Sequence, residues 1–293
     1  MIKPAAAVAV VILLICAFLA GYWTGKTGPE PAPSEIVLHE LGVVQVAYGQ
    51  TSASLPSPPP FDGVRAPYIY IHGPDGSKVS VNVTFTNGSP TSTIPQATVT
   101  ENSISWENVV VTDNGLTYQN ESFPYLFYEG ELLYGNPLHI EITSPDNYEN
   151  YVTFKVVNLG NLTLKHIYIF CNPHFSGFSN VFAYFEKLGP QEQEERTVSI
   201  PPEGSSGPIP AYENQIIPTM VSENIYENEA RDFLCEWIDY WTSFAEAPSA
   251  RTIYQIPSSV TEEILPLDIQ VPSGAELTSK RILWAMIENV PLS

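Results

Sequence analysis

Short apolar segments that alternate with polar residues constrain the fold of this chain more than any other feature. The clearest example contains four apolar residues at every second position: Val79, Val81, Val83 and Phe85. Turn-forming residues flank it, and the same period of two recurs at 138–142, 152–156 and 167–171. A period of two indicates strands with one buried face, and short strands between turns are typical of β-sandwiches. The sequence therefore predicts a mainly β protein with β-sandwich domains at 64–136 and 137–210, the second one immunoglobulin-like.

The N-terminal segment 5–23 contains no charged residue and ends in Tyr22 and Trp23. As a helix it would span about 28 Å, close to the thickness of a bilayer's hydrocarbon core. Cleavage by signal peptidase would follow Ala20 or Gly25, and either site puts a large aromatic residue where a small one is required. We therefore expect an uncleaved signal anchor at 1–26, with the N-terminus inside and a single-pass topology.

The composition after this anchor is strongly acidic. The chain has 12 Lys and Arg residues against 32 Asp and Glu residues, a net charge of −20. Nucleic-acid binding depends on basic residues that neutralise phosphates, so this function class is excluded. We expect an extracellular ectodomain whose first part, 27–63, is a Pro- and Gly-rich stalk with a strand near 36–47.

Residues 137–202 carry a recognisable pair of motifs. A strand ends in Asn158-Leu159-Gly160-Asn161, and a later turn reads Leu188-Gly189-Pro190-Gln191-Glu192. This segment resembles the CARDB-type immunoglobulin-like modules of prokaryotic surface proteins, although Gln191 stands where the family has Gly. The resemblance implies a β-sandwich that serves as a spacer or adhesion module, and it implies no catalysis.

The last region, 211–293, changes character. Apolar residues spaced three and four apart predict a helix from Ser222, as its cap, to about residue 245. A short helix at 259–265 is predicted from a capping box of Ser259 and Glu262. Strands are expected at 253–256, 267–271 and 282–290, although the last segment could also be helical. The region is therefore predicted to be a small α+β module.

A Cys-x-x-His sequence at Cys171 and His174 follows an aromatic strand and resembles the ligand loop of plastocyanin-type copper proteins. A blue-copper site needs a second histidine, for which His139 or His72 is available, and usually an axial Met, which is absent. The alternative interpretation, a purely structural loop, is favoured.

The predicted long helix also carries acidic residues at one-face spacing: Glu229, Asp232, Glu236 and Asp239. Paired carboxylates can bind Ca²⁺ or act in acid–base chemistry. The favoured interpretation is a solvated face opposite the aromatic stripe, so no cofactor is predicted beyond these weak calcium and copper candidates.

The sequence also contains cysteines and asparagines that could be modified. Cys171 and Cys235 are the cysteines outside the anchor, and they either form a disulfide or are two separately buried thiols. Asn-x-Ser/Thr sequons, which are candidate glycosylation sites, occur four times: Asn82, Asn87, Asn120 and Asn161.

No convincing catalytic motif occurs, so the sequence favours a membrane-anchored cell-surface or envelope protein that acts in structural roles or in binding a protein or surface-polymer partner. Three alternatives stay open. The protein could be an accessory subunit of a membrane complex, a hydrolase with its site in the C-terminal module, or a copper-binding electron-transfer protein.

Overall fold

The structure is a computed structural model that describes residues 35–47, 52–54, 67–143, 151–173, 181–200, 209–244 and 249–290. The anchor predicted at 5–23 and the candidate ligand His174 lie outside the described residues. Within these ranges, no helix combines the length and the apolar character needed to cross a membrane. The prediction of a mainly β protein is confirmed.

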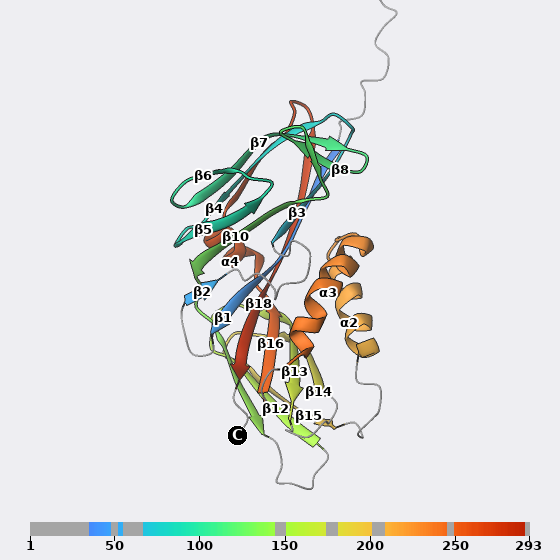
Figure 1. Cartoon of the computed structure of the whole chain (residues 1–293). Coiled ribbons are helices and arrows are strands. Elements are labelled where there is room, and N and C mark those ends of the chain that lie inside the picture. Colours follow the sequence, from blue (N-terminus) through green and yellow to red (C-terminus); the bar gives the residue numbers. More distant parts are fainter. Residues whose placement is uncertain are drawn as a thin grey trace, which may run out of the picture.

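One long sheet forms the spine of the molecule (Figure 1). At its centre β1 (Glu35–Ala47) and β18 (Glu276–Val290) pair in parallel, from Glu35 opposite Glu276 to Ala47 opposite Glu288. The strand order is β14-β13-β16-β18-β1-β2-β10-β3, with β5 paired to β10 and a further pairing of β1 with β3. The other strands of this sheet are β2 (Ser52–Ser54), β3 (Tyr68–His72), β5 (Gly88–Ile94), β10 (Leu126–Leu133), β13 (Leu164–Asn172), β14 (Val181–Leu188) and β16 (Ser249–Gln255).

Two smaller sheets pack on one face of the long sheet. The upper one contains β4 (Lys78–Thr84), β6 (Thr98–Val99), β7 (Ser103–Thr112), β8 (Gly115–Tyr118), β9 (Glu121–Phe123) and β17 (Leu267–Gln270). The lower one contains β11 (Leu138–Thr143), β12 (Tyr151–Asn158) and β15 (Gln193–Ser199). Their alternating apolar residues and those of the long sheet share one continuous buried core, as the period of two requires.

Two helices cover the opposite face of the long sheet: α2 (Ile209–Ser222) and α3 (Glu227–Thr242) (Figure 1). The alternation along β1 explains how it serves both faces. Ile36 and Leu38 enter the core under the small sheets, whereas Leu41 and Val43 contact the helical layer. A strand buried on both faces carries apolar residues on both, as β1 does, and its buried polar residues, His39 and Glu40, are each paired.

The helical layer differs from the sequence prediction. Ser222 ends α2 and does not cap α3, whose N-cap is Tyr226. Helix α2 was not predicted, because it contains Pro218 and several β-branched residues that weaken a helical pattern. Helix α4 (Ser258–Ile264) lies close to its predicted place, but its N-cap is Pro257 and no side chain caps it.

Strand pairing crosses the domain boundaries expected from the sequence. β16 pairs with β13, β17 pairs with β4, and β18 pairs with β1. Strands of the expected C-terminal module therefore complete both the long sheet and the upper sheet.

The two motifs that resemble the CARDB family contact each other. The buried amide of Asn158 donates hydrogen bonds to the carbonyl oxygens of Leu162, Leu188 and Gly189, at 2.8 to 3.1 Å. Gln191 has a φ of +59°, a left-handed conformation that favours glycine, the residue that the family has here. Its side-chain amide donates to the carbonyl oxygens of Leu159 and Gly160 at 2.7 and 3.0 Å, which ties the two turns together.

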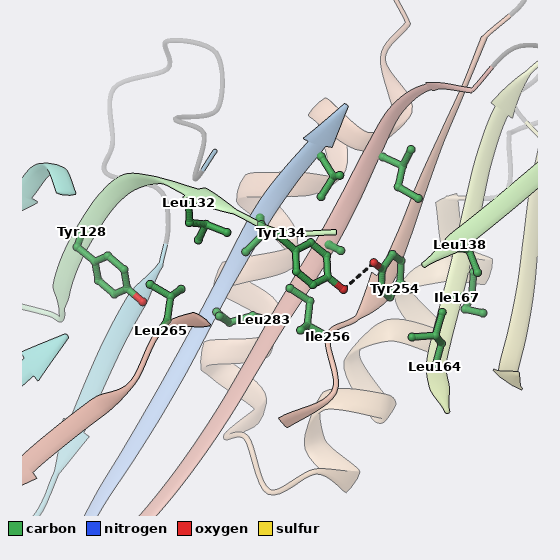
Figure 2. Packing of buried hydrophobic residues seen from close by; sticks show 14 of the residues in the cluster. Tyr128, Leu132, Tyr134, Leu138, Leu164, Ile167, Tyr254, Ile256, Leu265 and Leu283 are labelled. Atoms are coloured by element: carbon green, nitrogen blue, oxygen red, sulfur yellow. Dashed lines mark hydrogen bonds between the residues drawn. The ribbon is translucent and has the colours of Figure 1, made fainter. Parts of the chain in front are cut away.

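Two groups of polar side chains inside the core are paired. Tyr134 and Tyr254 meet through their hydroxyl groups at 2.8 Å in the middle of the apolar cluster (Figure 2). On the neighbouring strands the fully buried carboxylate of Glu40 is held by Arg281 and by the hydroxyl of Tyr128. Arg281 also contacts Glu262 of α4 at 2.9 Å, so Glu262 forms an ion pair where the sequence predicted a helix cap.

Candidate functional site

Two histidines lie side by side on the helix-covered face of the long sheet. In the antiparallel pairing of β1 with β3, His39 lies opposite Tyr70, and Val37 lies opposite His72. His39 and His72 are therefore diagonal neighbours on one face, a placement that brings long side chains within reach of each other. Their ring centroids are 5.8 Å apart.

The third member of this cluster is Glu229, in the first turn of α3. It begins a row of buried residues spaced four apart, continued by Phe233, Trp237 and Trp241. Because side chains four apart share a helix face, the aromatic packing of this row turns the Glu229 carboxylate toward the sheet. There Oε2 lies 2.6 Å from Nδ1 of His39, and Oε1 lies 2.5 Å from Nε2 of His72.

This carboxylate is almost completely removed from water. The Glu229 side chain is 1% exposed and that of His39 is 2% exposed, whereas that of His72 is 37% exposed. Burial alone would raise the pKa of Glu229, but the hydrogen bonds from His39 and His72 outweigh it, and the pKa lies below its ordinary value. The cluster thus keeps a carboxylate ionised inside the protein and open to solvent on the His72 side.

Aromatic rings surround the cluster. The ring of Tyr226 packs on both imidazoles, with centroids 4.7 Å from His39 and 4.8 Å from His72. Tyr70 lies beside the cluster on β3, and burial, with neighbouring Tyr125 and Glu229, holds its pKa above the ordinary value. Two residues before Tyr70 on β3, the hydroxyl of Tyr68 donates a hydrogen bond to Glu236 of α3.

His39, His72 and Glu229 can hold a metal ion. One ligand atom from each residue lies within 4.8 Å of the others, and among the described residues no other group of three such side chains meets this limit. Imidazole with one carboxylate suits zinc and its transition-metal neighbours, whereas calcium takes six to eight oxygen ligands. Metal–ligand bonds of about 2.0–2.1 Å place the ligand atoms of a tetrahedral site about 3.3 Å apart. Binding of an ion would therefore lengthen each distance between the carboxylate oxygen and the imidazole nitrogen by less than about 1 Å.

Of the copper candidates, His72 belongs to this cluster, whereas Cys171 and His139 lie elsewhere. Cys171 is fully buried in the long sheet, and burial raises the pKa of its thiol to about 12. His139 lies on β11 of the lower sheet, with its ring 3.2 Å from Glu141. The cluster described above contains neither residue.

The four acidic residues predicted to share one face of α3 differ in their burial. Glu229, which the sequence interpretation assigned to a solvated face, is buried, and this assignment is wrong for that residue. Asp232 and Asp239 are exposed, whereas Glu236 is half-buried beneath the Tyr68 hydroxyl. Only the first of the four carboxylates therefore joins the two histidines.

Cys171 and Cys235 are both free thiols, so the disulfide considered from the sequence is absent. Cys171 points into the core beneath the small sheets, whereas Cys235 is exposed on α3 across the long sheet. The alternative of two buried thiols holds for Cys171 alone.

The four sequons differ in setting. Asn87, Asn120 and Asn161 are exposed in turns, whereas Asn82 lies on β4 between β7 and β17 and is half-buried. Asn87 and Asn161 also border one cavity of about 270 Å³ between the upper and lower parts of the molecule. Its apolar lining includes Leu133, Leu162 and Val260.

The sequence contained a signal for the cluster that was not used. Glu229 stands four residues before Phe233 and eight before Trp237, within the apolar spacing of α3. A carboxylate in the apolar row of an amphipathic helix is buried with a partner far more often than alone. His39 and His72, each in an apolar strand segment, were the available partners.

Comparisons with known proteins give only remote likenesses. No family model matches the sequence, and no curated protein matches it. The yeast delta-COP-I mu-homology domain complexed with the Dsl1 WxWxV peptide has a TM-score of 0.37 at 10% identity, over 90% of this chain and 100% of that chain. The same yeast domain alone gives 0.36 at 10% identity, over 88% and 97% of the two chains.

Red sea bream transglutaminase gives a TM-score of 0.21 at 8% identity, over 90% of this chain and 33% of that one. Scores at this level do not define a shared fold.

Proposed function

We propose that this protein is a membrane-anchored surface protein whose β-rich ectodomain binds a divalent transition-metal ion, with zinc as the representative, at His39, His72 and Glu229. The observation that supports it is one buried carboxylate held between two imidazoles from different strands. These three groups are ligands that zinc sites use.

The hydrogen bonds within the cluster support this proposal. Each imidazole presents to Glu229 the same nitrogen that would bind the ion, so little rotation of the rings is needed. A buried carboxylate is costly unless it is paired. A divalent ion bound at this point would place two positive charges directly beside the buried carboxylate.

The ion would also connect parts of the chain that are far apart. Glu229 is 190 residues from His39 and 157 residues from His72. An ion bound here would therefore join β1 and β3 of the long sheet to the helical layer. Binding to the folded state alone stabilises it, by about 2.7 kcal/mol when the free ion is at 100 times its dissociation constant.

The cellular setting belongs to the same proposal and comes from the sequence. The apolar segment 5–23 anchors the protein, the immunoglobulin-like sandwiches that share the long sheet act as a spacer, and the ectodomain binds a partner outside the cell. Glycans would occupy the exposed sequons Asn87, Asn120 and Asn161. Asn82 would stay unmodified, because its strand is paired on both sides.

Zinc titration of the purified full chain in detergent micelles tests the metal site. We expect one zinc ion per chain by calorimetry and elemental analysis, and a higher unfolding temperature with zinc. His72→Ala should weaken binding by about tenfold or more, since it removes one of three ligands.

His139→Ala is the matched control, because this half-exposed histidine lies on a different sheet. The proposal fails if zinc does not bind the unaltered chain, or if the two alanine variants bind zinc equally well.

A further inference from the structure

The cavity of about 270 Å³ between the upper and lower parts of the molecule lies apart from the histidine cluster. Its lining comes mainly from the link between β10 and β11, from the loop between β12 and β13, and from helix α4. The buried side chains of Tyr134 and Leu164 line its inner part. Leu133 and Leu162, which are 58% and 39% exposed, border its mouth.

The volume and the apolar lining of this cavity suit a small organic molecule. An apolar cavity of about 150 Å³ is large enough to hold benzene. The larger volume here has room for one aromatic ring or a short alkyl chain with a few further atoms, and it lies just below the usual range for ligand pockets. Apolar lining residues such as Leu164 and Val260 would be in contact with such a group.

Hydrogen bonds between the lining segments hold the cavity open. The backbone amide of Leu133 donates to the carbonyl oxygen of Asn87 at 3.0 Å, which fixes the end of β10. The amide of Leu159 donates to the carbonyl oxygen of Pro137 at 2.8 Å, which ties the loop after β12 to the link before β11. These bonds are made within the chain itself, so the cavity is pre-formed, as most sites for small molecules are.

One charged side chain borders the cavity. Of the described residues that line it, Glu263 is the only acidic one, and none is basic. The hydroxyl of Thr86 donates to the backbone carbonyl oxygen of Glu263 at 2.6 Å, which fixes this part of α4. The Glu263 side chain is exposed, and its carboxylate has no ion-pair partner within the described ranges. The side-chain amides of Asn87 and Asn161 border the same cavity and can accept hydrogen bonds from an ammonium group.

We infer that this cavity binds a small primary ammonium ion carried on an apolar ring or short chain. The apolar body fills the space beside Leu164 and Val260, and the ammonium group pairs with Glu263. An anion of the same shape would meet an unpaired carboxylate in a chain of net charge −20. None of the three candidate metal ligands lines this cavity, so the inference does not depend on metal binding.

Three fluorinated compounds of one shape and different charge test this inference. They are para-fluorophenylethylamine, para-fluorophenylethanol and para-fluorophenylacetate, which near neutral pH are a cation, a neutral molecule and an anion. The full chain in detergent micelles is titrated with each and followed by fluorine NMR, with protein-free micelles as the blank. It is made in a host that adds no N-glycans, because Asn87 and Asn161 border the mouth. We expect the amine to bind about two- to fivefold more tightly than the alcohol, the ratio typical of an exposed charge pair, and the carboxylate to bind most weakly.

Matched variants locate the site. A Cβ added at Gly135, which lines the cavity, would meet no atom within 4 Å, so Gly135→Leu should fold and abolish saturable binding of all three compounds. Leu162→Ala should weaken the binding of all three, whereas Leu159→Ala, at an exposed leucine outside the lining, should not. Glu263→Gln should remove the preference for the amine over the alcohol. Asp268→Asn removes the same charge from an exposed residue of β17 and should leave that preference unchanged.

Each result has a defined meaning. If no compound gives a saturable shift beyond that of protein-free micelles, the cavity is not a binding site for this class of molecule. Binding that both Gly135→Leu and Leu162→Ala leave unchanged would place the ligand elsewhere and overturn the assignment to this cavity. Equal binding of the amine and the alcohol, or equal effects of Glu263→Gln and Asp268→Asn, would overturn the choice of an ammonium ion.

Discussion

Replacement of Arg281 by Met should cost this protein a large part of its stability. Arg281 is the cationic partner of Glu40, whose carboxylate is fully buried between the two central strands and the upper sheet. Without Arg281 this carboxylate keeps one hydrogen-bond donor among the described residues, the hydroxyl of Tyr128, 2.5 Å away. An ion pair broken in this way typically costs about 3–5 kcal/mol, because one charge stays buried and uncompensated.

That loss compares with a total stability of about 5–15 kcal/mol for a folded domain. Urea unfolding followed by tryptophan fluorescence measures it, since Trp106, Trp237, Trp241 and Trp284 are all buried. Arg196→Met is the matched control, because its pair with Glu194 is 43% and 36% exposed and such pairs are worth about 0.2–1 kcal/mol.

A second variant tests the reasoning itself. Glu40→Leu combined with Arg281→Met removes both charges, and it should be less destabilised than Arg281→Met alone. A single variant that loses less than about 1 kcal/mol, or a double variant that is no better than the single one, would refute the explanation by an uncompensated charge.

Three further predictions follow from other contacts. The hydrogen bond from Lys280 outweighs partial burial and holds the pKa of Glu223 below its ordinary value. This carboxylate therefore stabilises the fold above about pH 4.5, and its contribution is lost as the pH falls through the lowered pKa. Glu223→Gln should flatten the dependence of the unfolding free energy on pH in that acidic range. Asn158→Ala leaves three carbonyl oxygens without their donor and should cost about 2–3 kcal/mol in urea unfolding. In the native protein a maleimide should label Cys235 and spare Cys171, as measured by peptide mass mapping.

Each of these predictions has a direct control. Glu227→Gln, which removes a highly exposed carboxylate, should leave the acid range of the pH profile unchanged. Asn161→Ala, three residues after Asn158 and exposed, should be nearly neutral in the same unfolding assay. Labelling of Cys171 at the rate of Cys235 would contradict its burial, and unfolding in urea should make both thiols react.

The sequence was most informative where one residue pattern decides the local structure. The alternations at 79–85, 138–142 and 152–156 became β4, β11 and β12, with apolar side chains inside as predicted. The apolar spacing after Tyr226 became α3. In these segments the burial of one face is a property of the segment alone, so periodicity is sufficient.

The sequence pattern of a strand does not show which strand it pairs with. Nothing within 282–290 indicates that β18 lies beside β1, because strand pairing depends on backbone groups that every residue has. The metal-ligand cluster has the same character. The apolar spacing of α3 marks Glu229 as a carboxylate that needs a partner, but only the pairing of β1 with β3 and the packing of α3 bring His39 and His72 to it.

The parallel pair at the centre of the molecule also determines when the protein can fold. Glu40 and Arg281, which meet in this pair, are 241 residues apart. During synthesis, β1 emerges early and must keep one hydrogen-bonding edge unpaired until β18 has been made. Contacts of such high sequence separation slow folding, and an unpaired apolar edge invites aggregation in the meantime. Until β18 has been made, the free edge of β1 is therefore the part of the nascent chain most exposed to wrong strand pairing.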